Sequence, residues 1–213
     1  MPEATSCPAP YFSDFVEGRR GEILDAALVV FREKGYEGGT MREVAAALGV
    51  TEPALYRHYP GKEALYADLL GLAGDRVVQT AMARMAEVRP ETLRESLLGL
   101  IAWGPPRQSR KMGGMLGTLL ASAPHNETLM KSLRQHLAKP MVAGIREFVP
   151  RVDAFFGIAR GPAALDSAVR VFASLFVGYF ATSKTLAMPD DDGAIVDAIL
   201  LVMGWTRTGS GRS

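Results

Sequence analysis

The residues best suited to chemistry in this sequence lie at positions 51–58, TEPALYRH. This run combines a carboxylate and small residues with Tyr56, Arg57 and His58, which can donate hydrogen bonds or carry positive charge. Arginine matches the O6 and N7 atoms of guanine, a carboxylate can accept from cytosine N4, and a small apolar surface fits the thymine methyl. Presented on one face of a helix, such a set predicts recognition of base pairs in a DNA groove.

Two elements would have to position this run, and the first is a short helix that precedes it. Thr40 and Glu43 have the spacing of a capping box, in which each side chain accepts a hydrogen bond from the other residue's backbone amide. Val44 and Leu48 then share an apolar stripe. Gly49 ends the helix, because glycine enters the left-handed C-cap conformation without a Cβ clash.

The second element is the helix that contains the run itself. Thr51 is its predicted N-cap, and Pro53 falls in the first turn, where a missing amide costs least. Leu55 and Tyr59 are four residues apart on one inward face, so the intervening side chains point elsewhere. The result is a helix-turn-helix pattern, although the same spacing also occurs in helical hairpins that bind no DNA.

The sequence of this segment is more specific than its spacing. GVTEPALYRHYPGKEALYADLL, preceded by RRGEILDAALVVFREKGYEGGTMREVAAAL, closely resembles the N-terminal domain of TetR-family transcriptional regulators. The resemblance runs from about Arg19 to Leu70 and includes the aromatic-rich LYRHY followed by PGKEALY. The remaining two thirds resemble the family only in length and helical character, as expected for its variable ligand-binding domain.

The resemblance implies a homodimeric repressor that places the 51–58 helix of each subunit in the major groove of one half-site of a palindromic operator. Thr40 and Arg42 would bind phosphates at the second helix, and Tyr56 and Lys62 would clamp the backbone. The residues implied to face base edges or nearby phosphates are Thr51, Glu52, Pro53, Ala54, Arg57 and His58. A ligand would tilt the helix after Lys62, change the spacing of the two recognition helices and lower operator affinity.

The composition and charge favour a globular protein over a generic nucleic-acid coat. Of 213 residues, 48% are hydrophobic and 22% charged, and the net charge is +1. Residues 11–62 contain seven Lys and Arg against eight Asp and Glu. A nonspecific coat would be strongly basic. A local site remains compatible, provided that the cations of the motif share one surface and the acids face away.

Helical periodicity in nearly every segment predicts an all-α fold with two domains. A first helix closes at Gly35, and a long helix runs from Lys62 toward Met85. Prolines, Pro150 among them, delimit the later helices, and Pro140 should kink or break its own helix. These later helices are predicted at about 91–103, 108–122, 126–149, 162–186 and 192–207. We predict a disordered leader at 1–16, a helix-turn-helix DNA-binding domain of three helices at 17–63, and a helical-bundle ligand-binding and dimerisation domain at 64–213, joined by the long helix.

The last two helices are apolar over most of their circumference. The 162–186 segment carries one broad stripe, and the final segment has apolar residues such as Ile199 and Leu200 on several faces. A helix of this kind must be buried on more than one side. It is either the deep core of one domain or, as in TetR-like proteins, a four-helix interface with a second copy of the chain. We predict a homodimer through these helices.

The middle of the chain is suited to a ligand pocket. Large, deformable and aromatic side chains would lie between bundle helices, where ligand sites tend to form. The predicted lining residues are Trp103, Met112, Met115, Leu119, Phe172, Phe176 and Tyr179. Each of them taken singly is more simply a core residue. Because ionised groups are scarce among them, the predicted effector is a small hydrophobic or aromatic molecule.

Other classes of function find little support in the sequence. It contains no HExxH, GxSxG, GxGxxG, P-loop or CxxC motif, and its three histidines are widely spaced. We therefore predict no catalytic residues, no metal and no cofactor. Cys7 is the only cysteine, the start lacks the features of a signal peptide, and no apolar run suits a membrane span, so we predict a cytoplasmic protein. An activator of the same fold, a helical protein-interaction module and a small enzyme remain as alternatives.

Overall fold

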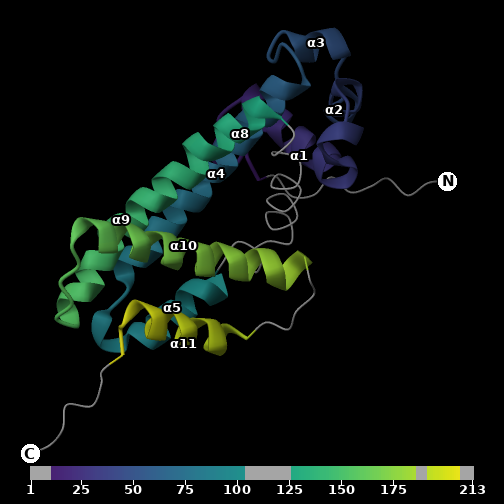
Figure 1. The fold of residues 1–213 in the computed structure, drawn as a ribbon. Coiled ribbons are helices and arrows are strands. Elements are labelled where there is room, and N and C mark those ends of the chain that lie inside the picture. The colour runs from purple at the N-terminus through teal and green to yellow at the C-terminus, as the bar shows by residue number, and fades with distance from the viewer. Residues whose placement is uncertain (1–10, 104–125, 186–190, 207–213) are drawn as a thin grey trace, which may run out of the picture. The chain divides into compact units, whose positions relative to one another are not determined.

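The computed structural model describes residues 11–103, 126–185 and 191–206, and every regular element in these ranges is helical (Figure 1). The predicted all-α fold is therefore confirmed. The elements are α1 (Arg19–Gly38), α2 (Met41–Ala47), α3 (Glu52–Tyr56), α4 (Lys62–Glu87), the 3-10 turn η1 (Pro90–Thr92), α5 (Leu93–Trp103), α8 (Glu127–Leu133), the π-helical turn η3 (Arg134–Ala138), α9 (Lys139–Phe155), α10 (Pro162–Thr185) and α11 (Asp192–Met203). Within the described ranges, none of these helices is long and apolar enough to cross a lipid bilayer.

The described residues divide into two compact units. The first comprises residues 11–74 and 126–134, and the second comprises 75–103, 135–185 and 191–206. The chain passes from the first unit to the second within α4, and again within η3, after Arg134. The domain limits expected from the sequence, 17–63 and 64–213, remain a prediction.

Aromatic rings form the centre of the first unit. Phe31 and Tyr36 both contact the ring of Tyr66, with centroid distances of 4.9 and 4.7 Å. The regular part of α1 ends at Gly35, where φ is 70°, a backbone conformation that glycine adopts at little cost. At Gly39 a Cβ would lie only 2.6 Å from Cδ1 of Phe31. The chain therefore uses both glycines to turn closely past the aromatic centre and enter α2.

Residues 11–16, which the sequence places in a leader, form a turn in the first unit. The carboxylate of Asp25 in α1 accepts hydrogen bonds from the backbone amides of Tyr11, Phe12 and Ser13 at 2.8, 2.6 and 3.1 Å. The Phe12 side chain is fully buried. One carboxylate thus satisfies three amides and fixes this segment against the unit.

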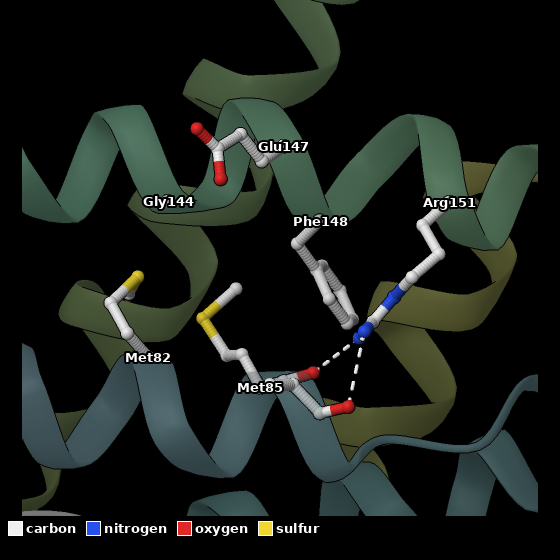
Figure 2. A pocket seen from close by; sticks show the side chains of 7 residues that line it. Met82, Met85, Gly144, Glu147, Phe148 and Arg151 are labelled. Atoms are coloured by element: carbon white, nitrogen blue, oxygen red, sulfur yellow. Dashed lines mark hydrogen bonds between the residues drawn. The ribbon is translucent and has the colours of Figure 1, made fainter.

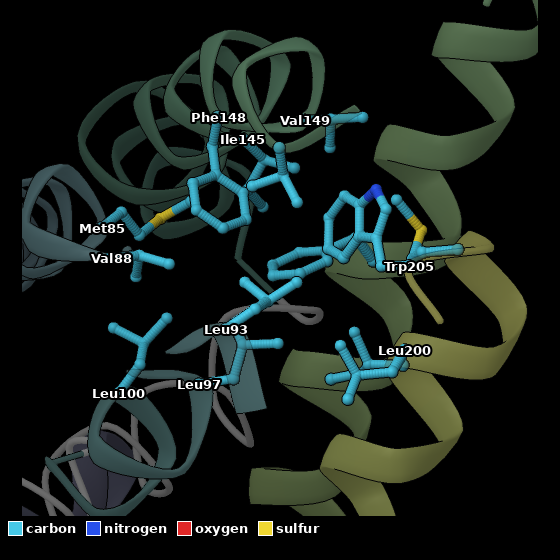
Figure 3. Close-up of a cluster of buried hydrophobic side chains, with 14 of the residues drawn as sticks. Met85, Val88, Leu93, Leu97, Leu100, Ile145, Phe148, Val149, Leu200 and Trp205 are labelled. Carbon is cyan, nitrogen blue, oxygen red and sulfur yellow. The ribbon is translucent and has the colours of Figure 1, made fainter. Parts of the chain in front are cut away.

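The second unit is built around a cluster of buried apolar side chains from α4, α5, α9, α10 and α11 (Figure 3). At its centre the rings of Phe148, Phe172 and Trp205 lie 5.5 to 6.0 Å apart. Val149 and Ile199 pack into the same cluster with no exposed surface. Each of these helices therefore buries one apolar face in a shared core.

The final helix is shorter than the sequence predicts. It ends at Met203 instead of residue 207, because Gly204 adopts a left-handed conformation with φ 73°. The amide of Trp205 then donates to the carbonyl of Leu200 at 2.9 Å, the pattern of a Schellman C-cap. This turn folds the Trp205 ring back into the core, where its exposed fraction is 2%.

The prolines of α9 behave differently from one another. Pro140 lies in its first turn, directly after the π-helical turn η3, so the irregularity predicted at Pro140 is present. The boundary predicted at Pro150 is wrong, because α9 continues through this residue to Phe155. Pro150 is exposed, whereas Val149 and Val152 beside it are fully buried. Burial of these side chains outweighs the loss of one backbone hydrogen bond. The helix predicted at 108–122 lies outside the described residues.

A buried carboxylate joins the end of α11 to the turn between α9 and α10. Asp153, which is 3% exposed, accepts from Arg160 Nε at 2.8 Å, from Arg160 Nη2 at 3.1 Å and from Trp205 Nε1 at 2.7 Å. Arg160 also donates to the carbonyl of Met203, at the last residue of α11. The network therefore fixes the C-terminal end of α11 through charge-assisted hydrogen bonds.

We expect Asp153→Ala to lower the free energy of unfolding by about 3–5 kcal/mol, because it removes the carboxylate shared by a partly buried guanidinium and a buried indole N–H. Denaturant unfolding at a fixed protein concentration measures the loss. The matched control is Asp166→Ala, which removes an ion pair with Arg146 whose side chains are 47% and 49% exposed. That exposed pair should contribute about 1 kcal/mol or less. Equal losses in the two variants would contradict a special role for Asp153.

Candidate nucleic-acid interface and ligand pocket

The capping box at the start of α2 is present as predicted. The Thr40 hydroxyl accepts from the Glu43 amide at 3.2 Å, and the Glu43 carboxylate accepts from the Thr40 amide at 3.0 Å. Lys34 from α1 forms an ion pair with the same carboxylate. The Lys34 hydrogen bond, followed by that of the Thr40 hydroxyl, lowers the pKa of Glu43. Thr40 and Glu43 are engaged with each other, whereas Arg42 between them is exposed and takes no part in the capping box.

A tight turn connects α2 to α3. Gly49 has φ 71°, and the amide of Val50 donates to the carbonyl of Ala45 at 2.9 Å. The turn closes α2 with the left-handed glycine that the sequence predicts. The direction in which α3 leaves α2 is therefore set by the backbone.

Helix α3 is shorter than the 51–58 run and is capped by backbone alone. The carbonyl of Thr51 accepts from the amides of Ala54 and Leu55 at 3.0 and 3.3 Å, and the predicted side-chain cap is not formed. Thr51 is therefore the N-cap residue, as predicted, but its hydroxyl makes no capping hydrogen bond, and this exposed side chain is available to a ligand. Arg57 and His58 follow the helix in a turn in which the His58 amide donates to the Leu55 carbonyl at 3.0 Å.

The two faces of α3 differ sharply in exposure. Leu55 is 1% exposed and Tyr59 8%, so these two residues hold the segment to the first unit. Tyr56 is 45% exposed. The other predicted contact residues of the run divide into Thr51, Pro53, Arg57 and His58, which are exposed, and Glu52 and Ala54, which are partly buried. The structure thus gathers the predicted residues of α3 on the outward side of one short helical turn and its flanks.

Lys62 has a structural role that the sequence did not reveal. Its ammonium donates to the carbonyls of Tyr36 and Glu37 at 2.8 and 3.3 Å and lies 4.5 Å from the centroid of the Tyr36 ring. An ammonium has three donors, so one remains for a phosphate. Lys62 therefore links the start of α4 to the end of α1, and it is also a predicted DNA contact. The GYEGG sequence signalled a turn there but not its cationic partner.

The electrostatics of this surface depend on which cations are already paired. Within residues 11–103, 126–185 and 191–206, Arg42 and Arg57 form no ion pair, whereas Arg20 and Lys34 pair with Asp68 and Glu43. Arg42 lies at the start of α2, and Arg57 lies directly after α3. A phosphate or a base edge would meet positive charge there, although the segment as a whole is close to neutral.

The predicted ligand pocket falls partly outside the described residues. Met112, Met115 and Leu119 lie there, as does the side chain of Trp103. Phe172 is a core residue, 1% exposed and stacked on Phe176 with a centroid distance of 6.2 Å. The hydroxyl of Tyr179 donates to Asp192 at the start of α11. Among the described residues, these three side chains are therefore engaged within the protein.

A different cavity, of about 340 Å³, lies between α4 and α9 of the second unit. Figure 2 shows Met82 and Met85 on one side, with Gly144, Glu147, Phe148 and Arg151 on the other. Arg151 donates to the carbonyls of Met85 and, at 3.1 Å, Ala86, and so caps the last turn of α4. Only weak signals of this site are present in the sequence: a methionine pair three residues apart and a glycine inside a helix.

Gly144 is the residue that lets Met82 lie against α9. A Cβ at position 144 would be only 1.8 Å from Sδ of Met82, so any larger residue must displace that flexible side chain. The walls of the cavity therefore differ in flexibility. Arg151 and the α4 backbone form a fixed end, and the methionines form an adaptable one.

Comparison with known proteins agrees with these features of the first unit. Residues 23–69 match the model of the family described as "Bacterial regulatory proteins, tetR family". The repressor KstR2 of Rhodococcus jostii is 40% identical over 53 residues, which are 25% of this chain and 26% of that protein. The chain spans between 26% and 36% of the length of the first curated relatives that it matches. The DNA-binding transcriptional repressor TetR of Mycobacteroides abscessus is 27% identical over 195 residues, covering 88% of this chain and 94% of that one.

The chain belongs to the TetR family. Solved structures of TetR-family proteins share its fold along most of the chain. A TetR transcription regulator from Haloarcula marismortui has a TM-score of 0.64 at 19% identity and covers 87% of this chain and 94% of its own. FadR from Bacillus subtilis, solved in complex with stearoyl-CoA, has a TM-score of 0.65 at 17% identity, with 85% and 96% covered.

Proposed function

We propose that this TetR-family protein is a transcriptional repressor that binds a palindromic operator as a homodimer and is released by a small hydrophobic or aromatic effector. The observation that carries the proposal is the two-faced α3 segment: Leu55 and Tyr59 are buried, and Tyr56, Arg57 and His58 are directed outward. Two relatives named above are repressors. A relative from Mycolicibacterium smegmatis, 42% identical over 60 residues, is the activator FasR, so activation is the alternative sign of regulation.

In this proposal some residues contact base edges and others contact the phosphate backbone. Arg57 reads a guanine, because its guanidinium is exposed and free of an ion pair among the described residues. Arg42 and the remaining donor of Lys62 bind phosphates, and the Tyr56 hydroxyl adds a neutral contact with the backbone. Glu52 lies in the first turn of α3, where the helix dipole favours a carboxylate, and accepts from a cytosine amino group.

We expect Arg57→Ala to weaken operator binding by about 1–3 kcal/mol while binding to unrelated DNA changes little, because a base contact carries sequence information. Arg42→Ala should weaken binding to all sequences and lower the slope of log affinity against log salt by about 1. Fluorescence anisotropy with promoter DNA from beside the protein's own gene, at several salt concentrations, measures both. If both variants bound like the parent protein, α3 would not be the recognition helix.

The proposed dimer uses the outward face of the last two helices. Leu201 is 71% exposed and Val202 58%, although Val196, Ile199 and Met203 of the same helix are buried. Val171 of α10 is a further large apolar residue on the surface, 36% exposed. Apolar side chains on both α10 and α11 fit a two-fold interface between copies of the chain.

We expect the parent protein to sediment as a dimer at micromolar concentration without DNA, and Leu201→Glu to sediment as a monomer. Because Leu201 is exposed within the subunit, the new carboxylate is buried only if a second copy covers it. Ala83→Glu, at an exposed position of α4, is the control and should leave the dimer intact. A monomeric parent would refute the dimer, and a dimeric Leu201→Glu would place the interface elsewhere.

The cavity between α4 and α9 is the effector site that we propose from the described residues. Its volume lies at the lower end of the range for small-molecule pockets. Two thioethers and the Phe148 ring provide apolar, adaptable walls, and Glu147 offers a carboxylate to a hydrogen-bond donor on the ligand. A bound molecule would contact the last turns of α4, the helix that begins with Lys62. An effector acts only if it binds the free and DNA-bound conformations unequally.

We expect the neutral aromatic amine N-phenyl-1-naphthylamine to bind the parent protein with saturable fluorescence. Gly144→Ala should weaken this binding by about fivefold, roughly 1 kcal/mol, because the new methyl drives Met82 into the cavity. Gly99→Ala, where a Cβ would meet no atom within 4 Å, is the matched control. Unchanged affinity in Gly144→Ala would exclude this cavity as the binding site.

A further inference from the structure

Three polar side chains from three parts of the first unit contact one another on the buried side of α3 and the turn that follows it. Arg20 of α1 donates to Asp68 of α4 through Nε at 2.9 Å and through Nη2 at 2.5 Å. Tyr59, in the turn after α3, donates its hydroxyl to Oδ2 of the same carboxylate at 2.5 Å. Asp68 is therefore a shared acceptor that links α1, α4 and the residues that leave α3.

This network is largely shielded from solvent on the Tyr59 side and open on the Arg20 side. Tyr59 is 8% exposed, whereas the side chains of Asp68 and Arg20 are 23% and 54% exposed. Burial, followed by the hydrogen bond to Asp68, raises the pKa of the Tyr59 hydroxyl. The hydrogen bond to Asp68 likewise raises the pKa of Arg20. Both donors therefore keep their protons throughout the range in which proteins bind DNA.

Helix α3 needs external support because it is only five residues long. A single turn of helix has too few internal hydrogen bonds to hold its own direction. Before α3, the turn at Gly49 fixes the backbone. After α3, the amide of Tyr59 donates to the Leu55 carbonyl at 3.1 Å, and the Tyr59 ring is buried. The Tyr59 hydroxyl is the polar contact that joins this end of the segment to α4.

We propose that Arg20, Asp68 and Tyr59 are positioning residues for DNA recognition, which fix the outgoing end of α3 without contacting DNA. The bidentate Arg20–Asp68 pair holds the carboxylate in one orientation, and that orientation sets where the Tyr59 hydroxyl lies. Arg57 and His58, two and one residues before Tyr59, are thereby presented at a fixed angle. The inference rests on the proposed function, since it assigns these residues a part in the same DNA site.

Tyr59→Phe tests the proposal by removing one hydroxyl and leaving the ring in place. We expect operator affinity to fall by about tenfold, as for loss of a hydrogen bond to a charged group. Affinity for unrelated DNA and the salt slope should stay unchanged, because no phosphate contact is lost. Tyr56→Phe is the matched control on the exposed face and should weaken binding to operator and unrelated DNA equally. A Tyr59→Phe variant that binds operator like the parent would overturn the proposal.

Arg20→Gln is a second test of the positioning role, because Arg20 is exposed and its replacement should leave the fold intact. It should lower operator affinity with no change in salt slope, and its effect should not add to that of Tyr59→Phe, since both act through Asp68. A slope reduced by about 1 would instead make Arg20 a phosphate contact and overturn its positioning role. Additive effects of Arg20→Gln and Tyr59→Phe would overturn the shared network.

Hydrogen exchange separates failure of this inference from failure of the proposed function. In protein without DNA, the amides of Leu55 and Tyr59 should exchange faster in Tyr59→Phe than in the parent, while amides of α2 exchange at parental rates. Unchanged exchange at both positions would refute the positioning role whatever the protein binds. If exchange accelerates but the parent binds no DNA, the network holds α3 as inferred and the proposed function is wrong.

Discussion

The burial of Leu55 and Tyr59 is the constraint on which the recognition surface depends. A five-residue helix cannot fix its own direction, and these two side chains, 1% and 8% exposed, tie it to the first unit from one side. The burial of this face determines which side chains of α3 are exposed. Tyr56 is exposed because Leu55 is buried, and the chain must turn at Arg57 and His58 because Tyr59 returns to the interior.

The acidic residues of the first unit explain how a nearly neutral segment can present positive charge. Asp25 accepts three backbone amides, Glu43 closes a capping box and pairs with Lys34, and Asp68 binds Arg20 and Tyr59. Each of these carboxylates is engaged in local structure. In a count of charges along the sequence, each of these carboxylates cancels one cation such as Arg57. In the structure, the groups that bind each carboxylate largely offset its electric field.

The sequence predicted best where a feature depends on neighbouring residues alone. The capping box at Thr40, the end of the regular first helix at Gly35 and the left-handed glycine at Gly49 follow from local backbone chemistry, and all three are present. The inward face of α3 follows from the spacing of Leu55 and Tyr59. Together these local features are sufficient to place the helix-turn-helix within the chain.

The features that the sequence did not reveal depend on partners distant in the chain. Lys62 contacts carbonyls some 25 residues earlier, and Asp68 contacts Arg20 at a separation of 48 residues. Helix α9 passes through Pro150 because the valines beside it enter a core formed by other helices. Each of these features rests on a tertiary contact, which periodicity along one segment cannot show, and at Pro150 that contact outweighs a local preference.

The last turn of α11 contributes side chains both to the buried core and to an exposed apolar surface. Gly204 reverses the backbone, which brings Trp205 into the core and lets its indole donate to the buried Asp153. This anchor keeps Ile199 and Met203 on the inner face, and helical spacing then directs Leu201 and Val202 outward. An apolar surface so exposed is costly for an isolated subunit unless another surface covers it. The same helix end therefore contributes to the buried network around Asp153 through Trp205 and to the exposed apolar surface through Leu201 and Val202.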